Sequence, residues 1–260
     1  MDSDIIIKPV LSLFGPSIRP HLWMHLYESV SQATTLPFEI IFCGPIAPTF
    51  DLPHNLIYIK TANIKLIQCW QIGAMHTKGD VISLVADDLI FSPGALDEAY
   101  SIYTQKNDYK AIIALRMFLR GADQTHTCKI PRYVDTNKRT MLIPGGLSLI
   151  SRKFFMELGG FDKSFIYCDA NFDLFIRAFY AGGSYFWCKE GHSDEDVGWA
   201  AKTYNTTWGH WGHQDTNLLK SLWSDNDNLR ETRSMPFESF VMDESIYQVS
   251  QGNNVPNKWV

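Results

Sequence analysis

The chain has 260 residues, 45% of them hydrophobic and 20% charged, as in globular proteins with a sizeable buried core. Its formal net charge is −5 and it has no long run of Lys or Arg, so we expect no nucleic-acid partner, because such binding needs a basic surface. The apolar run at residues 5–7 is too short to span a membrane, and the five cysteines form no CxxC pair. We therefore expect a cytoplasmic protein without a membrane span, a disulfide framework or structural zinc.

Hydrophobic runs of strand length alternate with helical patterns along the first 115 residues. The predicted strands lie at residues 5–13, 38–43, 56–60, 81–85 and 111–115, and the predicted helices at 18–33, from a cap at Asn63 to 77, and from 92 onward. Such alternation is typical of βαβ units. We expect an α/β fold with a mostly parallel sheet flanked by helices on both faces.

The second part of the chain begins with a polar connection at 120–140. A strand at 141–150, helices at 152–158 and 171–181, and a strand at 184–189 are predicted to follow it. The last seventy or so residues are rich in Trp, Gly, Asn and Asp and have weak periodicity. We expect a catalytic domain at 1–190 and a C-terminal extension at 191–260, packed on that domain as a lid or acceptor-binding segment.

Asp87 and Asp88 directly follow the predicted strand at 81–85. Ligands of open parallel sheets bind at the carboxyl ends of the strands, and adjacent carboxylates there can hold a divalent cation that neutralises a diphosphate. The pair could instead cap the next helix, but Ser92 and Pro93 already stand at its cap and first-turn positions. The sequence therefore favours a cation site.

Several motifs resemble those of family 2 glycosyltransferases and their GT-A relatives in order and spacing. They are Lys78 to Asp88, Gly145 to Arg152, Gly159 to Asp162 and Phe172 to Arg177, with earlier matches at 28–30 and 38–41. The resemblance covers residues 5 to 190, roughly, and implies a GT-A (Rossmann-like) fold. It also implies an enzyme, a glycosyltransferase with Mn or Mg as cofactor. Its partners would be a nucleotide-sugar donor and a glycan or other hydroxyl acceptor, and most of the family inverts the anomeric carbon.

The resemblance implies a nucleotide contact for Asp87 and a metal contact for Asp88. Gln68 and Gly146 are further candidate contacts of the nucleotide sugar, since a glycine lets the backbone approach a ligand closely. Family members that bind uridine usually have an acid after the second strand. This chain has Cys43 there, so the base of the donor stays open.

Family members often add a metal or diphosphate contact from a histidine beyond the last strand. The candidates are His192 and the His210 and His213 pair, which lies among Trp and Gly residues. Imidazole is a common metal ligand, and neighbouring glycines permit close approach, so the pair is preferred over His192. Nearby tryptophans could stack on sugar rings or form a small aromatic core.

The expected catalytic base is missing from its usual place. The family carries an Asp where this chain has Asn171, and an amide cannot take a proton. Asp169 and Asp173 are the remaining catalytic candidates. Asp169 could instead be a helix cap, and Asp173 could form a structural ion pair with Arg177 four residues on.

Two other functions stay open. A catalytically degenerate GT-A protein would bind carbohydrate or nucleotide without turnover, in keeping with Asn171. A sugar nucleotidyltransferase would carry a Gly-rich, basic phosphate loop after the first strand, and residues 14–19 are a poor version of such a loop.

Overall fold

The computed structural model describes residues 8–62, 65–125, 133–134, 140–141, 147–195, 208–223 and 247–251. The strands are β1 (Leu11–Pro16), β2 (Phe38–Gly44), β3 (Leu56–Thr61), β4 (Val81–Leu84), β5 (Leu89–Phe91), β6 (Ala111–Leu119), β7 (Ala122–Asp123), β8 (Tyr133–Val134), β9 (Thr140–Met141), β10 (Ser148–Ser151), β11 (Ser184–Glu195) and β12 (Tyr247–Gln251). The helices are α1 (Trp23–Ala33), α2 (Leu66–Met75), α3 (Ala95–Lys106), α4 (Arg152–Glu157), α5 (Ala170–Tyr180) and α6 (Trp208–Trp223), with a short 3-10 helix η1 (Pro20–Leu22) before α1.

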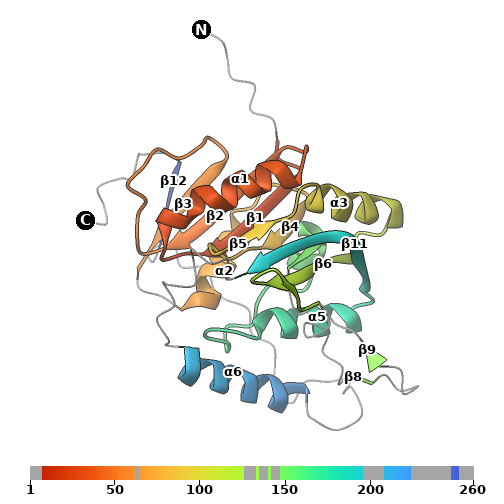
Figure 1. The fold of residues 1–260 in the computed structure, drawn as a ribbon. Coiled ribbons are helices and arrows are strands. Elements are labelled where there is room, and N and C mark those ends of the chain that lie inside the picture. The colour runs from red at the N-terminus through yellow and green to blue at the C-terminus, as the bar shows by residue number, and fades with distance from the viewer. Residues whose placement is uncertain are drawn as a thin grey trace.

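One ten-stranded sheet forms the centre of the molecule, in the order β12-β3-β2-β1-β4-β10-β6-β11-β5, with β7 beside β6 (Figure 1). β1 pairs in parallel with both β2 and β4, and β2 with β3. β6 and β11 are also parallel, whereas β10 runs antiparallel between β4 and β6. This arrangement confirms the predicted α/β fold with a curled, mostly parallel sheet flanked by helices.

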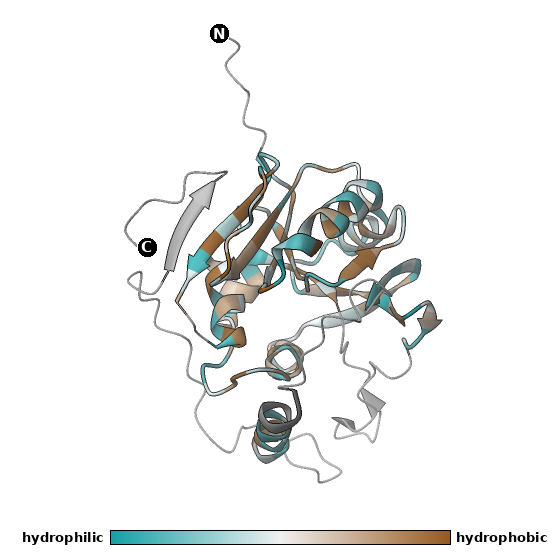
Figure 2. Cartoon of the chain, turned by 60° about the vertical axis from the view of Figure 1, so that its left-hand side comes forward, coloured by the Kyte–Doolittle hydropathy of each residue, from teal (hydrophilic) through white to brown (hydrophobic). Residues whose placement is uncertain are grey.

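Helices cover both faces of the sheet. α1 and α3 pack on one face, and α2, α4 and α5 on the other, with α6 lying beyond α5 (Figure 1). The central strands are the most hydrophobic part of the chain in Figure 2, as expected for strands buried on both faces. The buried side chains accordingly form two clusters, one on each side of the sheet.

The first strand lies further along the chain than the sequence suggests. β1 begins at Leu11 rather than at residue 5, and it continues through Gly15 to Pro16, where a break was expected. A Cβ on Gly15 would lie 2.0 Å from the carbonyl oxygen of Val85. The glycine is therefore required by the close passage of β1 beside the end of β4, and it does not interrupt the strand.

Two predicted helix caps differ from the structure. α2 begins at Leu66 with Lys65 at its N-cap, and the expected cap, Asn63, lies outside the described residues. The N-cap of α3 is Gly94, in a left-handed conformation, rather than Ser92. The Ser92 hydroxyl instead accepts a hydrogen bond from the backbone N–H of His192, so it holds β11 beside β5.

Two strands in the second part of the chain extend beyond their predicted ends. The strand expected at 141–150 is described only at its ends, as part of β9 and as β10. β6 and β11 are both longer than predicted because their outer halves pair with each other after a register shift between Trp187 and His192. β11 thus passes through residue 190, and its end pairs with β5, a strand that the sequence did not indicate.

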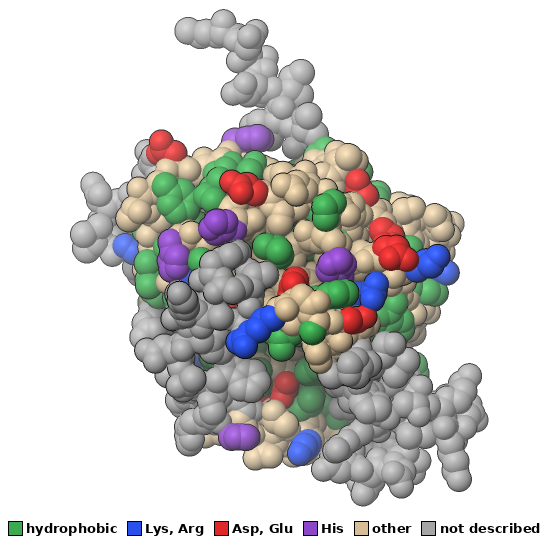
Figure 3. Space-filling model, in the orientation of Figure 1, with side chains coloured by type: hydrophobic (Ala, Val, Ile, Leu, Met, Phe, Trp, Pro, Cys, Tyr) green, Lys and Arg blue, Asp and Glu red, His purple; other side chains and the backbone are tan. Residues whose placement is uncertain are grey.

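The described surface mixes side chains of different kinds. Acidic and basic groups are interspersed on the face seen in Figure 3, with hydrophobic groups between them. Within the described ranges, none of the helices combines the length and the apolar character needed to cross a bilayer.

Gly44, at the end of β2, provides a test of how tightly the loop after β1 is packed. A Cβ at Gly44 would lie 1.9 Å from the backbone oxygen of Ser17. We expect Gly44→Ala to lower the free energy of unfolding by about 3 kcal/mol, because backbone atoms cannot move aside cheaply. Gly94→Ala is the control, since a left-handed position with no atom within 4 Å should cost only about 1 kcal/mol. Equal losses in urea unfolding would contradict the close packing.

Candidate functional site

Two loops meet at the carboxyl edge of the sheet. β1 and β4 are parallel neighbours, so the segment after β1 and the turn after β4 lie side by side. The first segment carries Ser17 and Arg19, and the turn carries Asp87 and Asp88. We call the place where these four residues meet the corner. Because the carboxylates occupy the turn between β4 and β5, their backbone is held on both sides by strands of the sheet.

Asp87 is turned inward and bonded by the loop after β1. It is 2% exposed, and its Oδ2 accepts hydrogen bonds from the Ser17 hydroxyl at 2.5 Å and from the backbone N–H of Arg19 at 3.2 Å. Its Oδ1 forms an ion pair with the Arg19 guanidinium. The indole N–H of Trp23 donates to the Ser17 hydroxyl at 2.6 Å and fixes it in turn. Both oxygens of Asp87 thus serve to hold the loop.

Asp88 differs from its neighbour in having an open oxygen. Its Oδ2 lies 3.0 Å from Nη2 of Arg19, whose guanidinium therefore bridges both carboxylates. Among the residues that the structure describes, Arg19 is the ion-pair partner of Asp88, and Oδ1 accepts no hydrogen bond from them. Burial raises the pKa of Asp87, while the guanidinium of Arg19 and the Ser17 hydroxyl oppose that rise.

The segment before α5 carries Tyr167 and Asp169. Burial is the main cause that raises the pKa of the Tyr167 phenol, with smaller electrostatic contributions from Cys168, Arg19 and Asp88. Two residues further on, Asp169 occupies the N-cap of α5 in a left-handed conformation, with φ at 61°. The ion pairs of the corner thus join a carboxylate pair and a guanidinium.

Asp169 does not use its carboxylate to cap the helix it begins. Its Oδ2 instead accepts a hydrogen bond from the Thr216 hydroxyl at 2.7 Å, from α6. Burial raises the pKa of Asp169, and the Thr216 hydrogen bond lowers it. Asp169 thus occupies the cap position without a side-chain capping bond, and its catalytic role stays a prediction.

Asp173 lies in the interior, where it joins three segments of the chain. It is 0% exposed, and its Oδ2 accepts from Nε of Arg177 at 2.9 Å, the ion pair expected from the spacing. Its Oδ1 accepts from the indole N–H of Trp223 at 3.0 Å. Arg177 also donates to the carbonyls of Leu158 and Gly160, both at 2.6 Å. These contacts favour the structural interpretation of Asp173.

The remaining predicted residues are not brought to this corner by any described contact. Gly146 lies outside the described residues, and so does the side chain of His210. His213 is exposed on α6. It lies about 200° around the helix axis from the buried Asp215, and so on the opposite face. Gln68 is half-buried on α2 and makes no hydrogen bond to another described residue.

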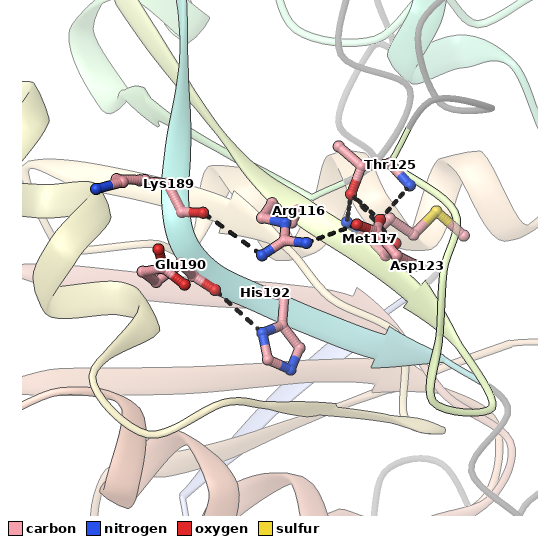
Figure 4. Close-up of polar contacts among 7 residues, drawn as sticks. All are labelled: Arg116, Met117, Asp123, Thr125, Lys189, Glu190 and His192. Carbon is pink, nitrogen blue, oxygen red and sulfur yellow. Dashed lines mark hydrogen bonds and ion pairs between the residues drawn. The ribbon is translucent and has the colours of Figure 1, made fainter.

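His192 is held at the other end of β5 from Asp88, where its backbone pairs with Ser92. Its Nδ1 lies 3.1 Å from the carbonyl oxygen of Glu190 (Figure 4). Its ring packs on that of Phe118, tilted by 31°, with centroids 4.2 Å apart. Arg116 lies beside His192 and forms an ion pair with Asp123 of β7 (Figure 4). No group of three or more His, Cys, Asp or Glu side chains that could hold a metal occurs within the described part of the chain.

Sequence reasoning missed Arg19 at this corner and the residues that meet in and around the loop before α5. Arg19 could have been identified from the sequence, because it is the one cation in segment 14–19. That segment was set aside as a poor phosphate loop. No signal in the sequence indicated Tyr167, Asp215 and Thr216. Their place depends on α6, a helix that the weak periodicity of the C-terminal segment did not indicate.

Comparison with known proteins bears on the fold. No protein-family model and no curated protein matches the sequence. Among solved structures, GalNAc-T7 with UDP, GalNAc and Mn2+ matches with a TM-score of 0.56 and 15% identity, over 73% of this chain and 44% of that chain. TarS residues 1–349 of S. aureus match with a TM-score of 0.53 and 12% identity, over 72% and 60%. The chain shares the fold of GT-A glycosyltransferases.

A Drosophila beta1,4galactosyltransferase 7 catalytic domain in complex with xylobiose also matches, with a TM-score of 0.46 and 12% identity, over 69% of this chain and 65% of that chain. The chain thus spans between 44% and 65% of the length of the three solved chains it matches. At these identities the similarity establishes the fold, and the chemistry has to be argued from the residues of the site.

The Arg19 bridge can be tested by removing its charge. We expect Arg19→Gln to lower the free energy of unfolding by about 3 kcal/mol at neutral pH, because Asp87 is left as a buried, unpaired carboxylate. The pKa of Asp87 is already raised by burial and should rise further in the variant. A native carboxyl with a raised pKa binds a proton more tightly than the unfolded one, so the deficit should shrink as pH falls through that pKa. Urea unfolding at pH 5 and pH 7.5 measures this, and a pH-independent deficit would contradict it.

The role of Asp173 is tested by stability. Asp173→Asn leaves the buried Arg177 without its counter-charge, so we expect a loss of about 3 to 5 kcal/mol in the free energy of unfolding. Trp223→Phe keeps that ion pair and removes one hydrogen bond to a carboxylate, for an expected loss of about 2 kcal/mol. If Asp173→Asn unfolds at the wild-type urea concentration, its contacts are not structural.

Proposed function

We propose that the protein is a glycosyltransferase that moves a sugar from a nucleotide-diphosphate donor to a hydroxyl acceptor, with Mn or Mg as cofactor. The observation that carries this proposal is the open Oδ1 of Asp88 beside the Arg19 guanidinium, at the carboxyl edge of a GT-A sheet. In open α/β sheets this edge is where ligands bind. A carboxylate oxygen next to a fixed cation suits the phosphate end of a nucleotide sugar with its metal ion.

The carboxylate of Asp88 is the feature of the corner that suits a divalent cation. Asp88 offers a hard oxygen ligand in a nearly buried turn, and Mg and Mn take carboxylate oxygens together with phosphate oxygens. When bound there, the cation supplies neutralisation of the charge that grows on the leaving diphosphate. Asp87 supports the site indirectly, because it holds the Arg19 guanidinium and the Ser17 hydroxyl in place.

Asp169 is our candidate for the base that accepts the proton of the acceptor hydroxyl. Its carboxylate is partly buried, does not cap α5 and belongs to the segment of Tyr167, whose phenol responds to the charges of Arg19 and Asp88. Burial raises the pKa of Asp169, which improves its match to a proton acceptor at neutral pH. A single displacement assisted by this base would invert the anomeric carbon, in keeping with the family 2 resemblance.

A protein that binds nucleotide or sugar without turnover is the second candidate. Asn171 favours it, because an amide stands where related enzymes carry their base. The two candidates differ in the chemistry they predict: only the transferase releases nucleoside diphosphate.

The test is release of nucleoside diphosphate from a panel of donors: UDP-N-acetylgalactosamine, UDP-glucose, GDP-mannose and dTDP-glucose. We expect release that needs Mn2+ or Mg2+ and falls about 100-fold or more in Asp88→Asn, which weakens the metal ligand. Asp169→Asn should abolish transfer while donor binding, read from the melting temperature, stays unchanged. Asp80→Asn is the matched control, an exposed carboxylate outside the corner. Donor-induced stabilisation without release would favour the binding protein.

A further inference from the structure

We propose that helix α6 is a positioning element of the catalytic site, in which Asp215 shapes the loop before α5 and Thr216 orients the Asp169 carboxylate. This inference rests on the proposed function, with Asp169 as the base. It assigns to the C-terminal segment a role in the chemistry, beyond that of a lid or an acceptor surface.

Asp215 binds the loop through its backbone. It is 1% exposed, and its carboxylate accepts hydrogen bonds from the N–H groups of Ile166 at 3.0 Å, Tyr167 at 2.6 Å and Cys168 at 2.9 Å. No cation neutralises Asp215 among the residues that the structure describes, so these oriented amides stabilise its charge. A carboxylate buried in this way dictates the backbone path of three consecutive residues directly before Asp169.

Thr216 acts on the next residue of the same loop. Its hydroxyl donates to Oδ2 of Asp169 at 2.7 Å, which fixes the direction of that carboxylate. The backbone of Asp169 is left-handed, a conformation that costs about 1 to 2 kcal/mol for a residue with a Cβ and persists where its surroundings impose it. Adjacent residues of one helix therefore hold both the loop and the base at its end.

α6 is itself firmly seated. Leu219, Leu222 and Trp223 are buried in the core cluster that also contains α5, and Trp223 stacks on Tyr180 with centroids 5.7 Å apart. The Trp223 indole also donates to Asp173 within α5. A helix anchored by these contacts can hold a loop without moving with it.

The charges around Asp169 set the sign of the pH effect. The groups that face it are the Asp215 carboxylate, which raises its pKa, and the Thr216 hydroxyl and Cys168 thiol, which donate to it and lower its pKa. Asp169 works as a base when deprotonated, so activity falls as pH drops through its pKa. Losing the Thr216 donor removes a stabiliser of the charged form, so this fall should occur at higher pH.

The primary variant is Thr216→Val, which keeps shape and removes the hydroxyl. With the best donor of the panel and Mn2+, we expect kcat to fall about 10-fold or more, the loss of one hydrogen bond to a charged group, while KM for the donor changes less than twofold. The acid limb of the kcat–pH profile should move to higher pH, and Thr216→Ser should restore both. Asn217→Ala, an exposed position on the same helix, is the control and should match wild type.

The second variant, Asp215→Asn, is read without activity. Hydrogen exchange at the amides of Ile166, Tyr167 and Cys168 should speed up in this variant and stay slow in Asn217→Ala, because Asn offers a weaker, uncharged acceptor. Slow exchange in Asp215→Asn, or a wild-type pH profile and kcat in Thr216→Val, would overturn the inference.

Failure of the proposed function looks different. A wild-type protein that releases no nucleoside diphosphate, or an active Asp169→Asn variant, removes the base itself and overturns both ideas together. An active wild type that requires Asp169 but is indifferent to Thr216 and Asp215 overturns only the role of α6.

Discussion

The guanidinium of Arg19, held between the carboxylates of Asp87 and Asp88, is the interaction on which the candidate site depends. Two adjacent carboxylates in a nearly buried turn repel each other, and burial penalises the charge of each. A cation that spans both removes much of this cost. It also fastens the loop after β1 to the turn after β4, so the same contact that stabilises the charges gives the corner its shape.

Two other buried carboxylates, Asp173 and Asp215, hold the elements around the candidate site in place. Asp173 is compensated by Arg177 and by the indole N–H of Trp223, and it ties α5 to α6. Arg177 in turn ties α5 to the carbonyl of Leu158. Asp215 is compensated by backbone amides and ties α6 to the loop before α5. Between these two anchors lies Asp169, whose carboxylate takes part in neither. Rigid support around one partly free group is the arrangement that acid–base chemistry requires.

The GT-A fold and the chemistry of this chain are separate conclusions. The sheet, its helices and its carboxyl edge match solved glycosyltransferases with TM-scores of 0.56 and 0.53. A fold of this kind provides the place for a nucleotide and leaves the reaction to the side chains set there. In this chain those side chains include the Arg19 guanidinium, which bridges two carboxylates.

The sequence by itself determined the features that depend on local pattern. Alternating hydrophobic periods predicted the α/β class, and the end of the strand at 81–85 placed Asp87 and Asp88 at the carboxyl edge of the sheet. The four-residue spacing predicted the Asp173–Arg177 pair. Each of these follows from neighbours within a few residues, which a sequence displays directly.

Only the tertiary structure decided which distant groups meet. Arg19 and Asp87 are 68 residues apart, and Thr216 and Asp169 are 47 apart, so no local period links them. The antiparallel position of β10 and the pairing of β5 with β11 likewise depend on strands far apart in sequence. Buried charges choose their partners through the packing of whole elements, and for that reason the carboxylates were visible in the sequence while the groups that neutralise and orient them were not.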